Sequence, residues 1–297
     1  MENFKSGFVS LIGETNVGKS TLLNAILGEN IAITTARPQT TRRAIKGIVN
    51  RENSQIIFID TPGIHRAKNK LGKAMLQTAY DTTADADVVL FLISAENEEI
   101  GDAESKIIEK IKEKNKKVIL VINKIDCIKK ERLLKIIEKY KNVYNFSAIV
   151  PISALRKEKI EALLDEIEEQ LPIGPAYYST DEYTDQTERQ LVEEIVREKC
   201  LKLLKYEIPH GIYVKVNKMK LRKTKKDEEI YDIDITIYCT RESHKGIIIG
   251  KDGEMLKKIG QYSRQKIEAI LGLKVNMRMW VKVDQNWQDK DNVIKNL

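Results

Sequence analysis

Four short motifs place glycine, lysine, carboxylate and amide groups directly after apolar segments of the chain. The first, Gly13–Ser20, has the spacing Gly-x-x-x-x-Gly-Lys-Ser and follows the apolar run 8–12. In this pattern backbone N–H groups close around phosphates, the lysine reaches the β- and γ-phosphates, and the serine hydroxyl ligates Mg²⁺. We therefore predict a nucleoside triphosphate with Mg²⁺. The predicted contacts are Gly13, Glu14, Thr15, Asn16, Val17, Gly18, Lys19, Ser20 and Thr21.

The second motif is Asp60-Thr61-Pro62-Gly63, which ends another apolar run. Alone it is an ordinary turn. Downstream of the first motif, it predicts that the Asp60 carboxylate holds Mg²⁺ through water and that the Gly63 N–H meets the γ-phosphate. We expect Lys19 and Gly63 to be catalytic. The four motif residues predicted to contact the nucleotide are Asp60, Thr61, Pro62 and Gly63.

A polar segment, 34–43, lies between these two motifs. A threonine in such a loop can bind Mg²⁺ only while the γ-phosphate is present, which would make the loop a switch. Thr40 and Thr41 are both candidates, and Thr41 is preferred as metal ligand and catalytic residue. The alternative is a solvated basic loop. Because Ile64 stands where a glutamine would orient the attacking water, hydrolysis is expected to be slow or to depend on another group.

Two further motifs predict guanine as the base. In Asn123-Lys124-Ile125-Asp126, the Asp126 carboxylate can accept hydrogen bonds from N1–H and the 2-amino group of guanine. Adenine has neither donor, so ATP would leave a buried carboxylate unpaired. In Ser153-Ala154-Leu155, the Ala154 N–H could reach guanine O6. The predicted base contacts are Asn123, Lys124, Asp126, Ser153, Ala154 and Leu155, and the four motifs together indicate GTP and GDP as ligands.

The composition is that of a soluble globular protein with room for two domains. The chain has 297 residues, is 42% hydrophobic and 32% charged, and has a net charge of +7. The positive charge favours an anionic partner. The three cysteines form no Cys-x-x-Cys pair, so we expect free thiols in a reducing cytosol. The N-terminus lacks the apolar stretch of a signal peptide, and no apolar run is long enough to cross a bilayer.

The first part of the chain alternates apolar runs with amphipathic stretches. Runs at 8–12, 56–59, 88–93 and 118–122, and one near Ile149, are typical of strands covered on both faces. Helical patterns lie between them. This order predicts an α/β domain with a mostly parallel sheet over residues 1–173. Proline, glycine, tyrosine and aspartate residues at 174–186 then predict a linker.

The rest of the chain, 187–297, has a different order of helical and strand patterns. A helical pattern at 187–206 precedes two alternating runs, a short helical segment, a glycine turn, a helix at 254–271 and an alternating run at 275–283. This α-β-β-α-α-β order predicts a compact α+β domain.

A turn, Gly250-Lys251-Asp252-Gly253, lies between the last two helical segments. A bare Gly-x-x-Gly is usually a helix–helix turn. Within the α-β-β-α-α-β order it instead predicts close approach of a single-stranded RNA backbone beside an apolar groove. We expect the isoleucines 247–249 to supply that groove and nearby lysines to contact phosphates. The predicted RNA contacts are Lys245, Gly246, Ile247, Ile249, Gly250, Lys251, Gly253, Lys257 and Lys258.

Seven basic residues crowd positions 215–226. They predict either a solvated face or a second contact with rRNA or an anionic membrane. No amphipathic anchor accompanies them, so the membrane is the lesser option. Trp280 alternates outward from its neighbours and could stack on a base or pack against the other domain.

With these motifs in place, the chain resembles the Era family of bacterial GTPases from about Phe8 to its C-terminus. Specific marks are Pro38–Arg42, Asp60–His65, Leu171–Pro175, Lys245–Gly250 and Trp280–Val283. The resemblance implies a P-loop GTPase domain joined to a type II KH domain, binding near the 3′ end of small-subunit (16S) rRNA, and a role in maturing the 30S subunit.

The same resemblance implies a hydrophobic residue at the position of Ile64 and a K⁺ ion held with the help of Asn16. It further implies a monomer in the cytoplasm, with peripheral contact at the inner face of the cell membrane as an additional expectation. Glu14-Thr15 and Asp252 depart from the residues common in the family. The first change should matter little because the backbone does the binding, and the second bears on RNA affinity.

Two other functions compete with a GTP-hydrolysing assembly factor. One is a nucleotide-gated RNA-binding module in which hydrolysis is incidental; variants that bind but do not hydrolyse GTP would then retain function. The other is a tRNA-modification or translation-factor GTPase, which the C-terminal pattern disfavours because those proteins contain other modules.

Overall fold

The computed structural model describes residues 3–29, 31–35, 40–64, 69–114, 116–205 and 208–295. They form two compact units, Met1–Asp185 and Gln186–Leu297. The family marks at Pro38, Gln39 and His65, and positions 36–39 of the expected switch loop, lie outside the described residues. None of the described helices is both long and apolar enough to cross a membrane.

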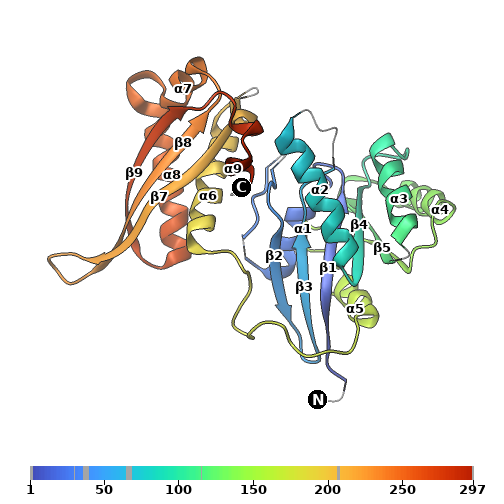
Figure 1. The fold of residues 1–297 in the computed structure, drawn as a ribbon. Coiled ribbons are helices and arrows are strands. Elements are labelled where there is room, and N and C mark those ends of the chain that lie inside the picture. Colours follow the sequence, from blue (N-terminus) through green and yellow to red (C-terminus); the bar gives the residue numbers. More distant parts are fainter. Residues whose placement is uncertain are drawn as a thin grey trace. The chain divides into compact units, whose positions relative to one another are not determined.

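The first unit contains a six-stranded sheet with strand order β2-β3-β1-β4-β5-β6 (Figure 1). All neighbouring pairs are parallel except β2 with β3. This arrangement confirms the predicted P-loop α/β architecture. The strands are β1 (Lys5–Gly13), β2 (Ile45–Asn50), β3 (Ser54–Asp60), β4 (Val88–Ser94), β5 (Lys117–Asn123) and β6 (Ala148–Pro151).

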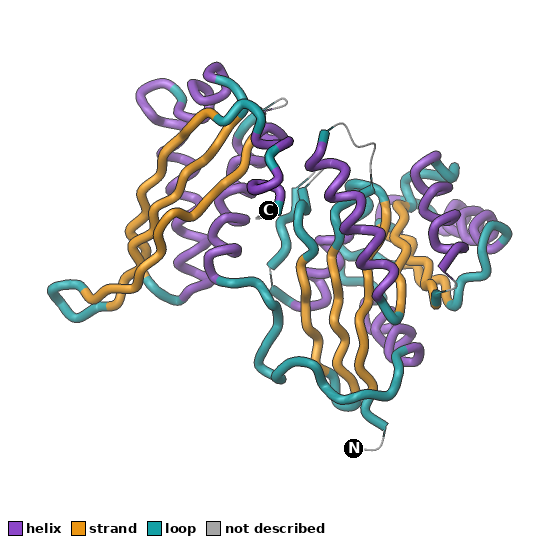
Figure 2. Tube along the Cα trace, viewed as in Figure 1, coloured by secondary structure: helices purple, strands orange, loops and turns teal. Residues whose placement is uncertain are grey.

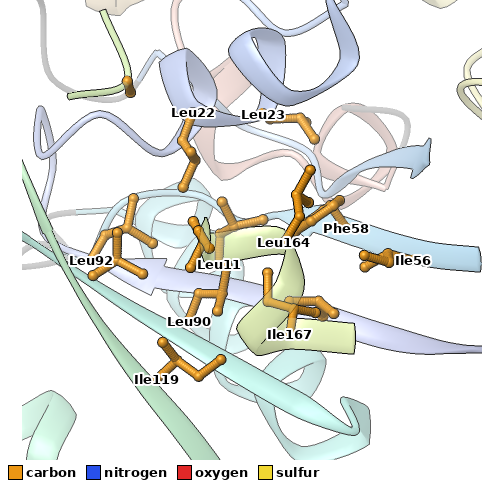
Figure 3. Close-up of a cluster of buried hydrophobic side chains, with 14 of the residues drawn as sticks. Leu11, Leu22, Leu23, Ile56, Phe58, Leu90, Leu92, Ile119, Leu164 and Ile167 are labelled. Carbon is orange, nitrogen blue, oxygen red and sulfur yellow. The ribbon is translucent and has the colours of Figure 1, made fainter. Parts of the chain in front are cut away.

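Helices cover both faces of this sheet, which explains its continuous apolar strands. One core lies between the sheet and α1 and α5, and includes Leu22, Leu90 and Ile167 (Figure 3). The other lies under α2, α3 and α4 and includes Phe91 and Ile108. The helices are α1 (Lys19–Leu27), α2 (Lys70–Asp85), α3 (Asp102–Lys114), α4 (Lys130–Lys141) and α5 (Ile160–Gln170), with a 3₁₀ turn η1 (Ile125–Cys127).

The segment 174–185, expected as part of a linker, runs along the first unit and belongs to it by contact. The Ile48 N–H donates to the Tyr183 carbonyl at 3.0 Å, and the Gln55 amide donates to the Tyr178 carbonyl at 2.9 Å. The segment is therefore hydrogen-bonded to the edge strand β2 and to β3.

The second unit is a three-stranded sheet in the order β7-β8-β9 with helices on one face (Figure 2). β7 and β8 are antiparallel, whereas β8 and β9 are parallel. The order α6-β7-β8-α7-α8-β9 confirms the predicted type II KH pattern. The elements are α6 (Glu188–Leu203), η2 (Ile208–Gly211), β7 (Ile212–Lys223), β8 (Glu229–Cys239), α7 (Glu242–Ile249), η3 (Lys251–Gly253), α8 (Glu254–Leu271), β9 (Lys274–Val283), η4 (Trp287–Asp289) and α9 (Asp291–Ile294).

Candidate nucleotide site and RNA groove

The phosphate loop connects β1 to α1, so its backbone N–H groups meet at a helix N-terminus. Gly18 has φ 103° and caps α1. A Cβ at this position would lie 2.2 Å from Nδ2 of Asn123, so both the backbone conformation and the close packing require glycine. The loop thereby offers partly positive N–H groups to an anion, with a contact to the loop after β5.

Lys19 is buried at the base of this loop, with 6% of its surface exposed. Its ammonium donates to the carbonyls of Gly13 at 3.0 Å and Glu14 at 2.7 Å. Burial lowers the pKa of Lys19 to about 8, although the nearby charges of Asp60 and Glu14 oppose this shift. An anionic ligand beside the ammonium would favour its charged form.

Three oxygen-bearing side chains converge where a divalent cation was expected. The Ser20 hydroxyl donates to Asp60 Oδ2 at 2.6 Å. The Thr41 hydroxyl lies 2.8 Å from that of Ser20 and donates to Asp60 Oδ2 at 3.1 Å. Thr40 is placed elsewhere, with its hydroxyl 2.9 Å from that of Thr35. Of the two threonines, only Thr41 therefore joins Ser20 and Asp60.

The Asp60 carboxylate is fully buried, and its second oxygen, Oδ1, has no hydrogen-bond partner among the described residues. Burial raises the pKa of Asp60, while Lys19 and the hydroxyls of Ser20 and Thr41 oppose the rise. A buried oxygen without a partner beside two hydroxyls is a donor set that suits Mg²⁺. The residues present therefore fit the metal predicted from the sequence.

The second motif lies directly against the phosphate loop. The Ile64 N–H donates to the Gly13 carbonyl at 3.1 Å, and a Cβ at Gly63 would lie 2.8 Å from Cγ2 of Thr15. The Ile64 side chain is buried in the core beneath α2 and α3. Because this side chain is apolar and buried, it offers no polar group to orient a water molecule.

A single cavity collects most of the phosphate-end residues predicted from the sequence. It also includes Ile33, Thr34 and Thr35, which the sequence motifs did not assign to the nucleotide. For the two threonines, their position in the polar segment 34–43 was the available signal. The lining residues are Thr15, Asn16, Gly18, Lys19, Ser20, Thr21, Ile33, Thr34, Thr35, Thr40, Thr41 and Gly63. Val17, Thr61 and Pro62 are buried behind it.

The base-end motifs meet through Asn123, at the end of β5. Its amide donates to the Val17 carbonyl at 2.8 Å. Its side-chain oxygen accepts from the N–H groups of Lys124 at 2.8 Å and Ala154 at 3.0 Å. One side chain thus joins the phosphate loop to both loops that were expected to contact guanine.

Asp126 lies on the neighbouring turn, and its side chain is only 8% exposed. Oδ1 accepts from the Ser153 hydroxyl at 2.7 Å, and Oδ2 lies 3.6 Å from Arg156 Nε. The Ser153 hydrogen bond, with help from Arg156, lowers the pKa of Asp126. The carboxylate is therefore a fixed, ionised acceptor. Leu155 is 79% exposed beside it.

In the second unit, the turn Gly250–Gly253 connects α7 to α8. Gly250 and Gly253 have φ of 76° and 79°, and nothing lies within 4 Å of a Cβ placed on Gly253. The open space at Gly253 leaves room for a backbone to approach. Ile247 is exposed and Ile249 is half-buried, but Ile248 lies in the core and cannot line a groove.

A groove of about 490 Å³ starts at Gly253 and runs between α8 and β9. Its apolar floor comes from Leu256, Met277 and Met279, and not from the isoleucines 247–249. Gly260 lets β9 approach, because a Cβ there would lie 3.3 Å from Sδ of Met279. The lining residues are Gly253, Leu256, Lys257, Gly260, Gln261, Arg264, Met277 and Met279.

Sequence reasoning had named only Gly253 and Lys257 of this set. The missing signal was helical spacing, since positions 256, 257, 260, 261 and 264 share one face of α8 and Gly253 caps its start. Lys245 lies outside the groove and pairs with Glu242 at 3.6 Å. Lys258 does not line it either.

Two family models match the two units separately. The model described as a 50S ribosome-binding GTPase matches residues 8–124, and a KH-domain model matches residues 207–288. GTPase Era from Caldanaerobacter subterraneus subsp. tengcongensis is 49% identical over 99% of this chain and 97% of its own length. GTPase Era from Clostridium botulinum strain Eklund 17B is also 49% identical, over 99% and 98%.

The chain belongs to the Era family of GTPases. Solved Era structures agree over the whole length. A complex of Era with MgGDPNP and nucleotides 1506–1542 of 16S ribosomal RNA is 40% identical, with a TM-score of 0.94 over 98% of both chains. A variant of Aquifex aeolicus Era bound to GDP and AlF₄⁻ is 39% identical, with a TM-score of 0.93 over 98% of both chains. The resemblance to Era drawn from the motifs is confirmed, as is the GTPase class.

Proposed function

We propose that this Era-family GTPase is a GTP-controlled switch that binds the 3′ region of 16S rRNA and assists maturation of the 30S subunit. The observation that supports this most strongly is that Ser20 and Thr41 both donate to Oδ2 of Asp60, while Oδ1 of the same carboxylate is buried without a partner among the described residues. The same chain has a groove beside a Gly-x-x-Gly turn. The related Era complex contains MgGDPNP and 16S rRNA together.

Each predicted residue receives a role from its contacts. Lys19 exchanges its carbonyl partners for the β- and γ-phosphates and so neutralises charge that develops during hydrolysis. Ser20 and Thr41 would hold Mg²⁺ directly, and Asp60 would hold it through water. The metal would neutralise negative charge on the phosphates during hydrolysis.

Gly63 provides the link between the nucleotide and the switch. Gly63 lines the phosphate cavity and lies close to Thr15, and we assign its N–H to the γ-phosphate. Ile64 contributes no polar group, so the attacking water needs another orienting charge. Asn16, with φ 65° at the cavity wall, is in position to help hold K⁺ there.

At the other end, Asp126 selects guanine. Its lowered pKa keeps the carboxylate ionised, and we assign it as the acceptor for N1–H and the 2-amino group. Ala154 N–H turns from Asn123 to guanine O6, and the Lys124 stem and Leu155 flank the base. ATP would offer the Asp126 carboxylate no donor from its base.

For RNA, the groove beside α8 accepts bases while Gly250–Gly253 admits the sugar-phosphate backbone. Lys251 and Lys257 contact phosphates. We further propose that the protein acts as a monomer in the cytoplasm, the compartment that holds its ribosomal partner. The lysine-rich hairpin of β7 and β8 is where peripheral contact with the cell membrane would occur.

Lys19→Ala tests the nucleotide site. We expect GTP turnover to be lost in Mg²⁺ buffer, and the parent to turn over faster in K⁺ than in Na⁺, with Asn16→Ala removing that difference. Full activity of Lys19→Ala would refute the site. Equal parent rates in the two salts would refute only the K⁺ assignment.

Gly253→Asp tests the RNA site, because it adds bulk and negative charge where the backbone should approach. Fluorescence anisotropy with a single-stranded oligonucleotide from the 3′ end of 16S rRNA should show loss of binding. A matched change at another open glycine with positive φ, Gly272→Asp, is the control. If Gly253→Asp binds like the parent, the groove is not the RNA site.

A further inference from the structure

The sheet of the second unit has one face that its helices do not cover. The helices pack on the side of Val214, Ile235 and Val275, and Figure 1 shows α6 and α8 on that side. Alternate residues point to the opposite, open face. They are Tyr213, Lys215, Lys218, Lys220 and Arg222 on β7, Ile230, Asp232, Asp234, Thr236 and Tyr238 on β8, and Lys274, Asn276, Arg278, Trp280 and Lys282 on β9.

This open face is strongly basic. It contains seven lysines or arginines against two aspartates, a formal surplus of five positive charges. Both aspartates are already paired: Arg222 contacts Asp232 at 2.6 Å and Arg278 contacts Asp234 at 2.8 Å. No ion pair between described residues involves the lysines at 215, 220 and 282, so their ammonium groups face solvent. They are available to an anionic partner.

Among the described residues of the second unit, aromatic rings cover the row of the face that contains Tyr213 and Tyr238. There Tyr213 stacks on Tyr238 with ring centroids 4.4 Å apart, and Trp287 packs on Tyr213 at 4.9 Å. In the next row, Lys215 and Trp280 flank Thr236. Trp280 is 44% exposed, and the Arg278 guanidinium lies 5.9 Å from its ring centroid. Exposed lysines are common on a protein surface in contact with water, but an exposed tryptophan among them offers an aromatic ring on which a base can stack.

The open face adjoins the RNA groove through one strand. β9 is an edge strand of the sheet, and its Met277 and Met279 line the groove. Its alternate residues, Arg278 and Trp280, lie on the open face. RNA that leaves the groove can pass round the outer border of β9, where Trp280 is the next residue after Met279 and lies on the opposite face of the strand.

We propose that this open sheet face is a second RNA-binding surface, which takes the continuation of the same RNA that occupies the groove. The free lysines contact phosphates and Trp280 stacks on a base, a combination used for RNA without reading its sequence. The two surfaces act on one molecule, so binding at the groove raises the effective concentration of the RNA at the face. This inference rests on the proposed function of the groove.

Two RNAs of different length distinguish binding at the groove from binding at the open face. The short RNA is a single strand of about six nucleotides, slightly longer than a KH groove clamps. The long RNA has the sequence of nucleotides 1506–1542 of 16S rRNA. The triple variant Lys215→Gln, Lys220→Gln, Lys282→Gln should bind the short RNA like the parent. It should bind the long RNA about tenfold more weakly, with a salt slope smaller by about two. The control replaces Lys112, Lys130 and Lys135, which are exposed on α3 and α4, by glutamine and should behave like the parent.

Tryptophan fluorescence gives an independent measurement. The chain has two tryptophans, of which Trp287 is fully buried and Trp280 exposed. The long RNA should quench the emission, the short RNA should not, and Trp280→Phe should abolish the quenching.

Failure of the parent to bind either RNA would overturn the proposed function. Parent-like binding of the long RNA by the triple variant, with an unchanged salt slope, would overturn only this inference. If the parent sediments with anionic phospholipid vesicles, the triple variant does not, and both bind the long RNA equally, the face binds a membrane instead.

Discussion

Replacing Asp126 by asparagine should reverse the choice of base. The side chain is 8% exposed, and Oδ1 is already hydrogen-bonded to Ser153 at 2.7 Å. Oδ2 has only the weaker neighbours Cys127 Sγ at 3.8 Å and Arg156 Nε at 3.6 Å, and we assign it to the guanine donors. The change converts one acceptor into an NH₂ donor that faces the 2-amino group of guanine, while Ser153 keeps the remaining oxygen in place.

The expected loss is at least one hydrogen bond to a charged acceptor, worth about 1.5–3 kcal/mol. This corresponds to a Kd for GDP that is about 10- to 150-fold weaker. Xanthosine diphosphate, which has a carbonyl in place of the 2-amino group, should gain affinity because the new NH₂ can donate to it.

Titration calorimetry with both nucleotides measures the two effects, with melting curves to show that the fold persists. Asp165→Asn on α5 is the matched control, since that carboxylate is 63% exposed and pairs with Arg51. Unchanged GDP affinity without a gain for xanthosine diphosphate would remove Asp126 from the base site.

Three further outcomes are expected. Thr41→Ala should lower Mg²⁺-dependent GTP turnover by at least about tenfold through loss of a metal ligand, whereas turnover by Thr40→Ala should stay within a few-fold of the parent. If a phosphate-release assay gives the opposite ranking, Thr40 is the ligand. Gly63→Ala should retain GDP affinity in calorimetry but lose GTP turnover, because its Cβ would meet Thr15 at 2.8 Å, and normal turnover would contradict the assigned role. The pKa of Asp126 is lowered in the folded protein, so the stability it contributes is fully present above its unfolded pKa of about 3.9 and is lost only as pH falls through the lower folded pKa. Between pH 5 and 8, Asp126→Asn should therefore lower the free energy of unfolding by a constant amount, measured by chemical denaturation. A loss that changes with pH across this range would contradict the assignment.

Motifs made of contiguous residues could be predicted from the sequence, because each loop follows a buried strand and needs no knowledge of distant contacts. The choice between Thr40 and Thr41 could not, since neighbouring threonines differ only in how a loop meets Ser20 and Asp60. The RNA groove was only partly predicted. Its turn is a local sequence pattern and could be predicted. Its floor combines Leu256 with methionines from β9, and the sequence around α8 does not indicate which strand lies beside that helix.

Two other differences have similar physical causes. Ile248 was expected in the groove, yet its position on the short helix α7 turns it into the core. The strand β2 was not anticipated because Gly47 and Lys46 interrupt its apolar pattern. Gly47 is required by α1, since a Cβ there would lie 2.6 Å from Cδ1 of Leu23.

The stretch 174–185 has a consequence for how the first unit could be isolated. β2 is an outer strand, and an outer strand with unpaired N–H and C=O groups invites addition of a strand from another chain. Tyr183 and Thr184 occupy that position in the intact protein. A fragment cut at Ile173 would expose the β2 border to self-association and fibre-like stacking, whereas one that extends to Asp185 keeps it sealed by its own polypeptide.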